Sequence, residues 1–86
     1  MRYLVHNQMR GPFSEEAQAL LGAEQAHVAE LFQAGILQQL YVAADYAQAW
    51  LVLNSASPED ASATAQALPL APFVDSTIVP LAEINQ

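Results

Sequence analysis

The sequence predicts a single α+β domain of ferredoxin-like topology, in which two helices cover one face of a four-stranded antiparallel sheet. Three observations support this prediction. Four segments have strand-like alternation or β-branched residues, two segments begin with a helix-capping serine followed by acidic residues, and their order is β-α-β-β-α-β. The chain has 86 residues and no visible internal boundary, so we assign residues 1–86 to one domain.

The first half of the chain predicts one strand and one helix. In the strand, residues 2–9, Arg2, Leu4, His6 and Gln8 alternate with a second set, Tyr3, Val5, Asn7 and Met9. After a turn at residues 10–13, Ser14 caps a helix whose first turn contains Glu15 and Glu16, where the helix dipole favours acidic residues. We expect this helix to run to about Ala34 and to end at Gly35.

The second half predicts a hairpin, a second helix and a final strand. Residues 36–43 and 47–54 form two strands around a tight turn at residues 44–46. Ser57 caps the second helix, Pro58 occupies its first position, and the helix ends before Pro69. The fourth strand is expected over residues 73–84, with Pro72 imposing an extended start and Pro80 marking a strand end or a sheet edge.

Composition limits the partners of the protein. Apolar residues make up 53% of the chain and charged residues 13%, against a usual charged share of about 25%. We therefore expect the uncovered sheet face to meet a second copy, as a homodimer or a larger homo-oligomer. Two arginines and a formal charge of −7 argue against nucleic acid and anionic membranes. We expect a cytoplasmic protein, because the first ten residues are too short and polar for a signal peptide.

Neither a disulfide nor a metal centre is expected. The chain has no cysteine and two histidines, which argues against a structural zinc site and gives no catalytic metal triad. Candidate chemistry therefore has to come from side chains that transfer protons.

Glu24 is the first such candidate. It interrupts the apolar stripe of the first helix, four residues after Leu20 and four before Val28. Burial of a carboxylate favours its neutral form, and a carboxyl group tuned in this way suits general acid/base catalysis. The alternative is that the apolar stripe is loosely packed at this point, so that Glu24 reaches solvent at the sheet edge or pairs with His27. We expect His27 to be a surface or rim residue.

His6 is the second candidate, because histidine moves protons near neutral pH. If Tyr3 and Val5 face the helices, His6 and Gln8 point to the open sheet face, where a hydrogen-bonded histidine at a wet interface is an equal alternative. Other candidates for contact with a ligand come from the remaining strands. Trp50 shares the open face, as the floor of a pocket or as a dimer-core residue. Asp75 can reach His6 because this topology places the last strand beside the first. Alternation does not decide which face Tyr41 takes.

Several short motifs resemble the muconolactone isomerase-like family. The run "LPLAPF" followed by "VDSTIVPL" is similar to the C-terminal stretch of that family, in which L-P-L-x-P-[FY] leads into the last strand. Ala23–Glu24 followed by Gly35, the pair Leu40–Tyr41 and the segment "YAQAW" also resemble family positions. The resemblance covers nearly the whole chain.

The resemblance implies a dimeric α+β barrel with a pocket between the helices and the open sheet face. It further implies an enzyme that shifts a double bond in a lactone by proton transfer, without metal or cofactor. On this analogy Glu24 matches a helix glutamate and His6 falls where the family enzyme has a basic residue. Where the family enzyme has an arginine and a histidine on the second strand, this chain has the uncharged residues Gln38, Gln39 and Val42. A neutral or less charged ligand therefore suits this acidic chain better.

Two hypotheses follow. The first is a cofactor-free isomerase or related proton-transfer enzyme acting on a small cyclic molecule, with Glu24 as acid/base and His6 as its partner or as a ligand-orienting group. The second is a non-catalytic homo-oligomeric module of the same fold that binds a small organic ligand or only assembles.

Overall fold

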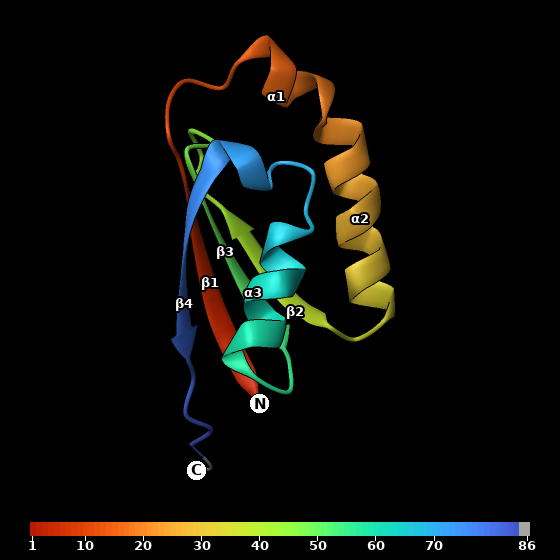
Figure 1. Ribbon diagram of the computed structural model, residues 1–86, viewed down its shortest axis with the longest axis vertical. Helices are drawn as coiled ribbons and strands as arrows, with labels where there is room; N and C mark the ends of the chain where they lie inside the picture. The colour runs from red at the N-terminus through yellow and green to blue at the C-terminus, as the bar shows by residue number, and fades with distance from the viewer. Residues whose placement is uncertain (85–86) are drawn as a thin grey trace.

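A computed structural model describes residues 1–84 as a four-stranded sheet with helices on one face (Figure 1). The strand order is β2-β3-β1-β4 and every neighbouring pair is antiparallel, which confirms the ferredoxin-like prediction. The elements, in chain order, are β1 (Arg2–Met9), α1 (Glu15–Ala19), α2 (Leu21–Gln33), β2 (Leu37–Val42), β3 (Gln48–Asn54), α3 (Pro58–Gln66), the 3₁₀ helix η1 (Ala71–Phe73) and β4 (Val74–Pro80).

The helix-capping residues act as the sequence predicts. The Oγ of Ser14 accepts a hydrogen bond from the backbone N–H of Ala17 at 3.2 Å, and the Oγ of Ser57 accepts one from the N–H of Asp60 at 3.1 Å. Gly35 follows α2 with φ = 75°, a left-handed conformation that glycine adopts without steric cost. These caps fix where the helices begin and where α2 turns back toward the sheet.

Three boundaries differ from the prediction. The first helix is divided at Leu20, whose N–H bonds to the carbonyl of Ala17 in a tightened last turn before α2 begins. Pro72 lies in η1 and does not start an extended strand, because the ring's fixed φ also suits the first residues of a helical turn. The last strand ends at Pro80, which lies on the outer strand β4, where a missing N–H is tolerated.

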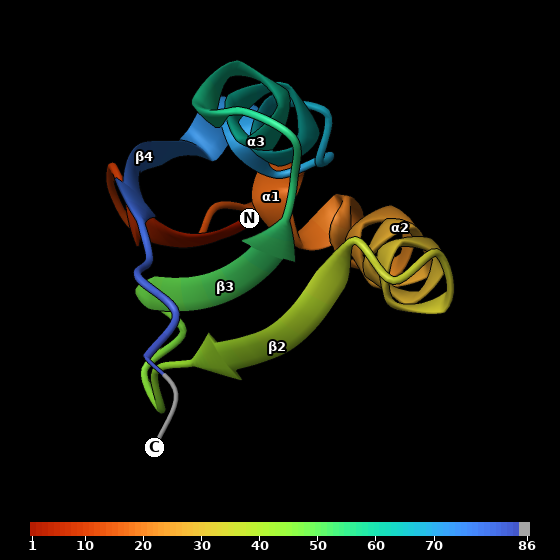
Figure 2. The same ribbon diagram turned by 90° about the horizontal axis from the view of Figure 1, so that it is seen from below.

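The hydrophobic core lies between the sheet and the helices. Tyr3 and Val5 of β1 and Leu51 and Leu53 of β3 are buried on the helix-facing side, as alternation predicts. The rest of the core comes from Leu31, Leu37, Ala61, Ala65 and Leu68. Figure 2 shows α2 and α3 on the same side of the sheet; within residues 1–84, no helix covers the other side.

Membrane-spanning segments were sought among the same residues. None of the helices within residues 1–84 combines the length and the hydropathy needed to cross a bilayer.

A candidate active-site pocket under the first helices

A pocket of about 340 Å³ opens between α2 and the helix-facing side of the sheet. This volume is in the range of small-molecule sites. Its floor comes from all four strands, one wall from α2, and the opposite wall from the end of α3 and the segment before β4. The lining residues are Asn7, Met9, Phe13, Leu21, Glu24, Gln25, Val28, Leu40, Val42, Tyr46, Ala47, Gln48, Ala49, Leu51, Ala65, Leu68, Leu70, Ala71 and Val74.

Glu24 is the acidic residue among those that line the pocket. It lies on the same face of α2 as Leu21 and Val28, one turn from each, so helical periodicity directs all three side chains to the pocket. The carboxylate is half-buried, and its Oε1 accepts a hydrogen bond at 3.0 Å from the backbone N–H of Leu70. This bond joins α2 to the segment that precedes β4, so Glu24 also holds two walls of the pocket together.

Tyr46 is a pocket residue that the sequence analysis did not select. It lies in the β2–β3 turn with φ = 60°, a left-handed conformation that is uncommon for an aromatic residue. The turn is closed by the Tyr46 N–H, which bonds to the carbonyl of Ala43 at 2.8 Å, and by the Asp45 carboxylate, which accepts from the Ala47 N–H at 2.9 Å. Tyr46 lines the pocket and is 71% exposed, so the residue lies at the pocket mouth.

His6 lies on the opposite side of the sheet from Glu24. Its ring stacks on Trp50, with 5.3 Å between centroids and 7° between planes, and its Nε2 is 2.8 Å from the Oε1 of Gln48. Successive strand residues point to opposite faces, so a residue paired with Trp50 cannot point under the helices. Glu24 and His6 therefore do not meet within one protomer, although we expected them to act together. The pocket also lies on the helix-facing side of the sheet, whereas we expected it to reach the open face.

The remaining open-face candidates form a second group around His6. Tyr41 pairs with Trp50, which settles its face, and its hydroxyl donates to the Oε1 of Gln39 at 3.2 Å. In the β1–β4 register, His6 pairs with Thr77, and Asp75 pairs with Gln8.

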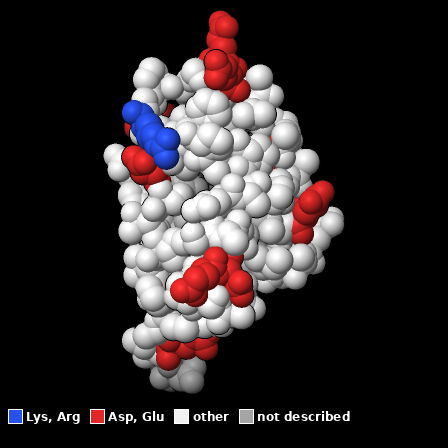
Figure 3. Space-filling model, in the orientation of Figure 1, with Lys and Arg blue, Asp and Glu red and all other residues white. Residues whose placement is uncertain are grey.

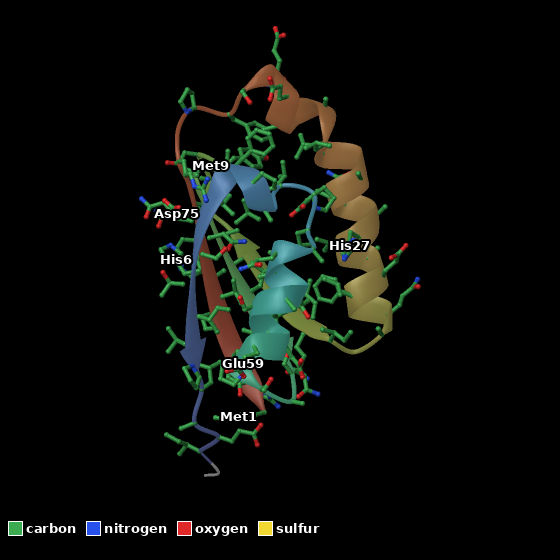
Figure 4. All side chains as sticks on the ribbon, viewed as in Figure 1. Met1, His6, Met9, His27, Glu59 and Asp75 are labelled. Carbon is green, nitrogen blue, oxygen red and sulfur yellow. The ribbon has the colours of Figure 1, made fainter. Side chains whose placement is uncertain are left out.

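Asp75 has a different partner from the one expected. Its Oδ1 accepts from the Nε of Arg10 at 2.8 Å, while the Nη1 of Arg10 donates to the carbonyl of Pro72. The arginine therefore ties the start of β4 to the end of β1. Figure 4 shows His6 and Asp75 on this side of the molecule, away from His27 on α2.

The seven predicted site residues thus separate by position. Glu24 lines the pocket, His27 lies half-buried one turn further along α2 and is not among the pocket-lining residues described, and the other five occupy the open face. Gln25, Asn7 and Tyr46 line the pocket but were not predicted. Two of these residues could have been predicted from the sequence. Gln25 is next to Glu24, and Asn7 belongs to the same alternating set of the first strand as Tyr3 and Val5, which face the helices.

The chain was compared with known families and structures. A family model described as muconolactone delta-isomerase matches residues 1–86. The crystal structure of a muconolactone isomerase is similar, with a TM-score of 0.82 and 23% identity over 98% of this chain and 91% of that one. Also similar is 5-chloro-2-hydroxyhydroquinone dehydrochlorinase from Burkholderia phenoliruptrix in complex with 2,5-dihydroxybenzoquinone, with a TM-score of 0.78 and 14% identity over 95% and 94% of the chains. No curated protein matches the sequence.

Proposed function

The chain belongs to the muconolactone delta-isomerase family, and on that premise we propose that it is a proton-transfer enzyme that isomerises a small cyclic or lactone-like molecule. The observation that carries the proposal is the position of Glu24, a half-buried carboxylate in the wall of a largely apolar pocket. A carboxylate held in such a place is suited to take up and return a proton.

In the proposed reaction, Glu24 removes a proton from a saturated carbon next to a C=C bond that is conjugated with the carbonyl of the substrate. The electron pair of the broken C–H bond moves into the conjugated system and places negative charge on the carbonyl oxygen. Glu24 then returns the proton to a different carbon, so the double bond shifts with no net change in atoms or electrons. We expect no metal or cofactor to be needed, because the carbonyl itself accepts the charge.

Two features of the pocket would assist this reaction. The Leu70 N–H holds Oε1 of Glu24 at 3.0 Å, which limits the orientations of the carboxylate. The phenol of Tyr46 and the amide of Gln25 are neutral donors on the pocket lining that can stabilise a developing enolate oxygen. The similar dehydrochlorinase, bound to a quinone, provides an example of a flat ring bound by this fold.

The test is exchange of carbon-bound hydrogen for deuterium, followed by NMR, on a panel of unsaturated lactones and cyclic enones in D₂O. We expect the protein to accelerate exchange, and Glu24→Gln to lose about 10²–10⁴-fold of that acceleration. The amide keeps an acceptor for the Leu70 N–H but cannot act as the base. An active Glu24→Gln variant would exclude Glu24 as the base.

A non-catalytic ligand-binding module is the second candidate function. One observation favours it: Glu24 already has a structural task in bonding Leu70, which alone explains why a glutamate occupies the apolar stripe. On this hypothesis, panel compounds bind in the pocket with no exchange above buffer, and Glu24→Gln binds them as well as the wild type does.

We also propose that the open sheet face is covered by a second copy of the chain. Trp50, Leu4 and Val52 are half-buried there, and Tyr41 and Val79 are exposed. A large apolar face of this kind is typical of an interface between chains. Sedimentation at low micromolar concentration should show a dimer or a larger assembly, and a stable monomer would contradict the proposal. We expect the assembled enzyme to act in the cytoplasm.

A further inference from the structure

We propose that the pocket selects an uncharged ring compound and discriminates against a substrate that carries a carboxylate. The inference rests on the proposed function only in taking this pocket as the substrate site. It concerns the charge of the ligand, which depends on the charges of the pocket lining and on the positions of the two arginines and the two histidines.

The pocket offers a carboxylate no opposite charge. Among its described lining residues, Glu24 is the one with an acidic side chain and none has a basic one, while the polar side chains of Asn7, Gln25 and Tyr46 are neutral; Gln48 is also among the lining residues, but its side chain points to the open face. A carboxylate brought into this space would lose hydration without gaining an ion pair. It would also be repelled by Glu24, because two like charges in a partly desolvated site interact more strongly than they do in bulk water.

The two arginines of the sequence, which has no lysine, are both engaged elsewhere. Arg10 binds Asp75 at 2.8 Å and the Pro72 carbonyl at 3.1 Å, and Arg2 lies 3.7 Å from Glu83. A second copy of the chain would bring the same two arginines in the same ion pairs. In Figure 3 the basic group on the visible face lies against an acidic one, and the other charged groups on that face are acidic.

The histidines do not supply the missing charge either. His6 lies on the open face, stacked on Trp50 and bonded to Gln48, whose Oε1 is thereby occupied. His27 is outside the described pocket lining. The net charge of −7 adds a long-range field that lowers the local concentration of anions.

The experiment compares two matched pairs of ligands by isothermal titration calorimetry at pH 7.5: muconolactone with its methyl ester, and phenylacetate with methyl phenylacetate. Each pair shares a ring and differs in one charge. We expect each ester to bind at least about tenfold more tightly than its acid, which corresponds to one like-charge contact in a partly desolvated site. The ratio should shrink as salt is added.

A pair of charge variants locates the effect in the pocket. Gln25→Arg places a cation on the pocket lining, and Gln33→Arg places the same cation at the exposed end of the same helix, outside the described lining. We expect Gln25→Arg to reduce the ester preference at least about fivefold and Gln33→Arg to leave it within a factor of two. Equal effects of the two variants would overturn the assignment to the pocket.

Other outcomes separate this inference from the proposed function. An acid that binds as tightly as its ester, or no binding by either pair at millimolar concentration, would overturn the inference. Binding is measured without turnover. If the esters bind tightly but no hydrogen exchange occurs, the proposed isomerase activity is excluded and the charge selection stands. If a free acid binds tightly and undergoes exchange, the charge selection is excluded and the proposed activity stands.

Discussion

Replacing Glu24 with alanine should destabilise the protein through the segment before β4. The substitution removes the acceptor 3.0 Å from the Leu70 N–H and leaves that partly buried donor unpaired, at a cost of about 1–3 kcal/mol. Glu24 also lies in the first turn of α2, where a carboxylate contributes about 0.3–1 kcal/mol through the helix dipole. Glu24→Gln loses the second contribution but keeps a carbonyl oxygen for Leu70, so the difference between the variants isolates the hydrogen bond.

The assay is thermal and urea unfolding followed by circular dichroism. In a domain of this size, 1 kcal/mol corresponds to about 4–8 °C, so Glu24→Ala should lower Tm by about 5–30 °C and Glu24→Gln by less than about 8 °C. Glu30→Ala makes the same chemical change at an exposed position of α2 and serves as the control, with an expected effect within about 0.5 kcal/mol. If Glu24→Ala were as stable as Glu30→Ala, the bond to Leu70 would contribute nothing and our account of this residue would be wrong.

Three further predictions concern backbone geometry. Gly35→Ala should lower the free energy of unfolding by about 1–2 kcal/mol because of its left-handed φ, whereas Gly22→Ala, within α2, should raise it by about 0.5–1 kcal/mol. An added Cβ meets no atom within 4 Å at either site, so urea unfolding compares conformation alone. Tyr46→Gly should leave Tm unchanged or higher, because it relieves a strained φ, while weakening ligand binding measured by calorimetry. Ser57→Ala should cost about 1 kcal/mol in unfolding experiments by removing the α3 cap, and an unchanged stability would contradict that role.

The fold was predictable because its signals are local. Ser14, Ser57 and Gly35 mark helix ends through bonds or torsions within a few residues, and alternation places Val5 and Leu51 on one face of the sheet. Where the prediction failed, the local signal was ambiguous. A proline such as Pro72 fits the start of a strand or of a 3₁₀ turn equally well, and only its neighbours in space decide.

The site was predictable only in part, because its contacts are distant in sequence. Glu24 stood out as a charge in an apolar stripe, but its partner is a backbone N–H 46 residues away, which no side-chain pattern reveals. Alternation assigned His6 to a face without showing that the pocket lies on the other one. Tyr46 was not predicted, because nothing in the sequence indicates that a tyrosine adopts the left-handed conformation, which glycine and asparagine usually adopt.

The strand order also has a consequence for folding during synthesis. Of the four strands, β1 is translated first, yet it lies between β3 and β4, and β4 is translated last of the four. Until residues 74–80 have left the ribosome, one edge of β1 has no partner, and an unpaired edge is a template for aggregation. Nascent chains of this protein should therefore depend on chaperones until β4 docks, and contacts of such high sequence separation favour slow folding.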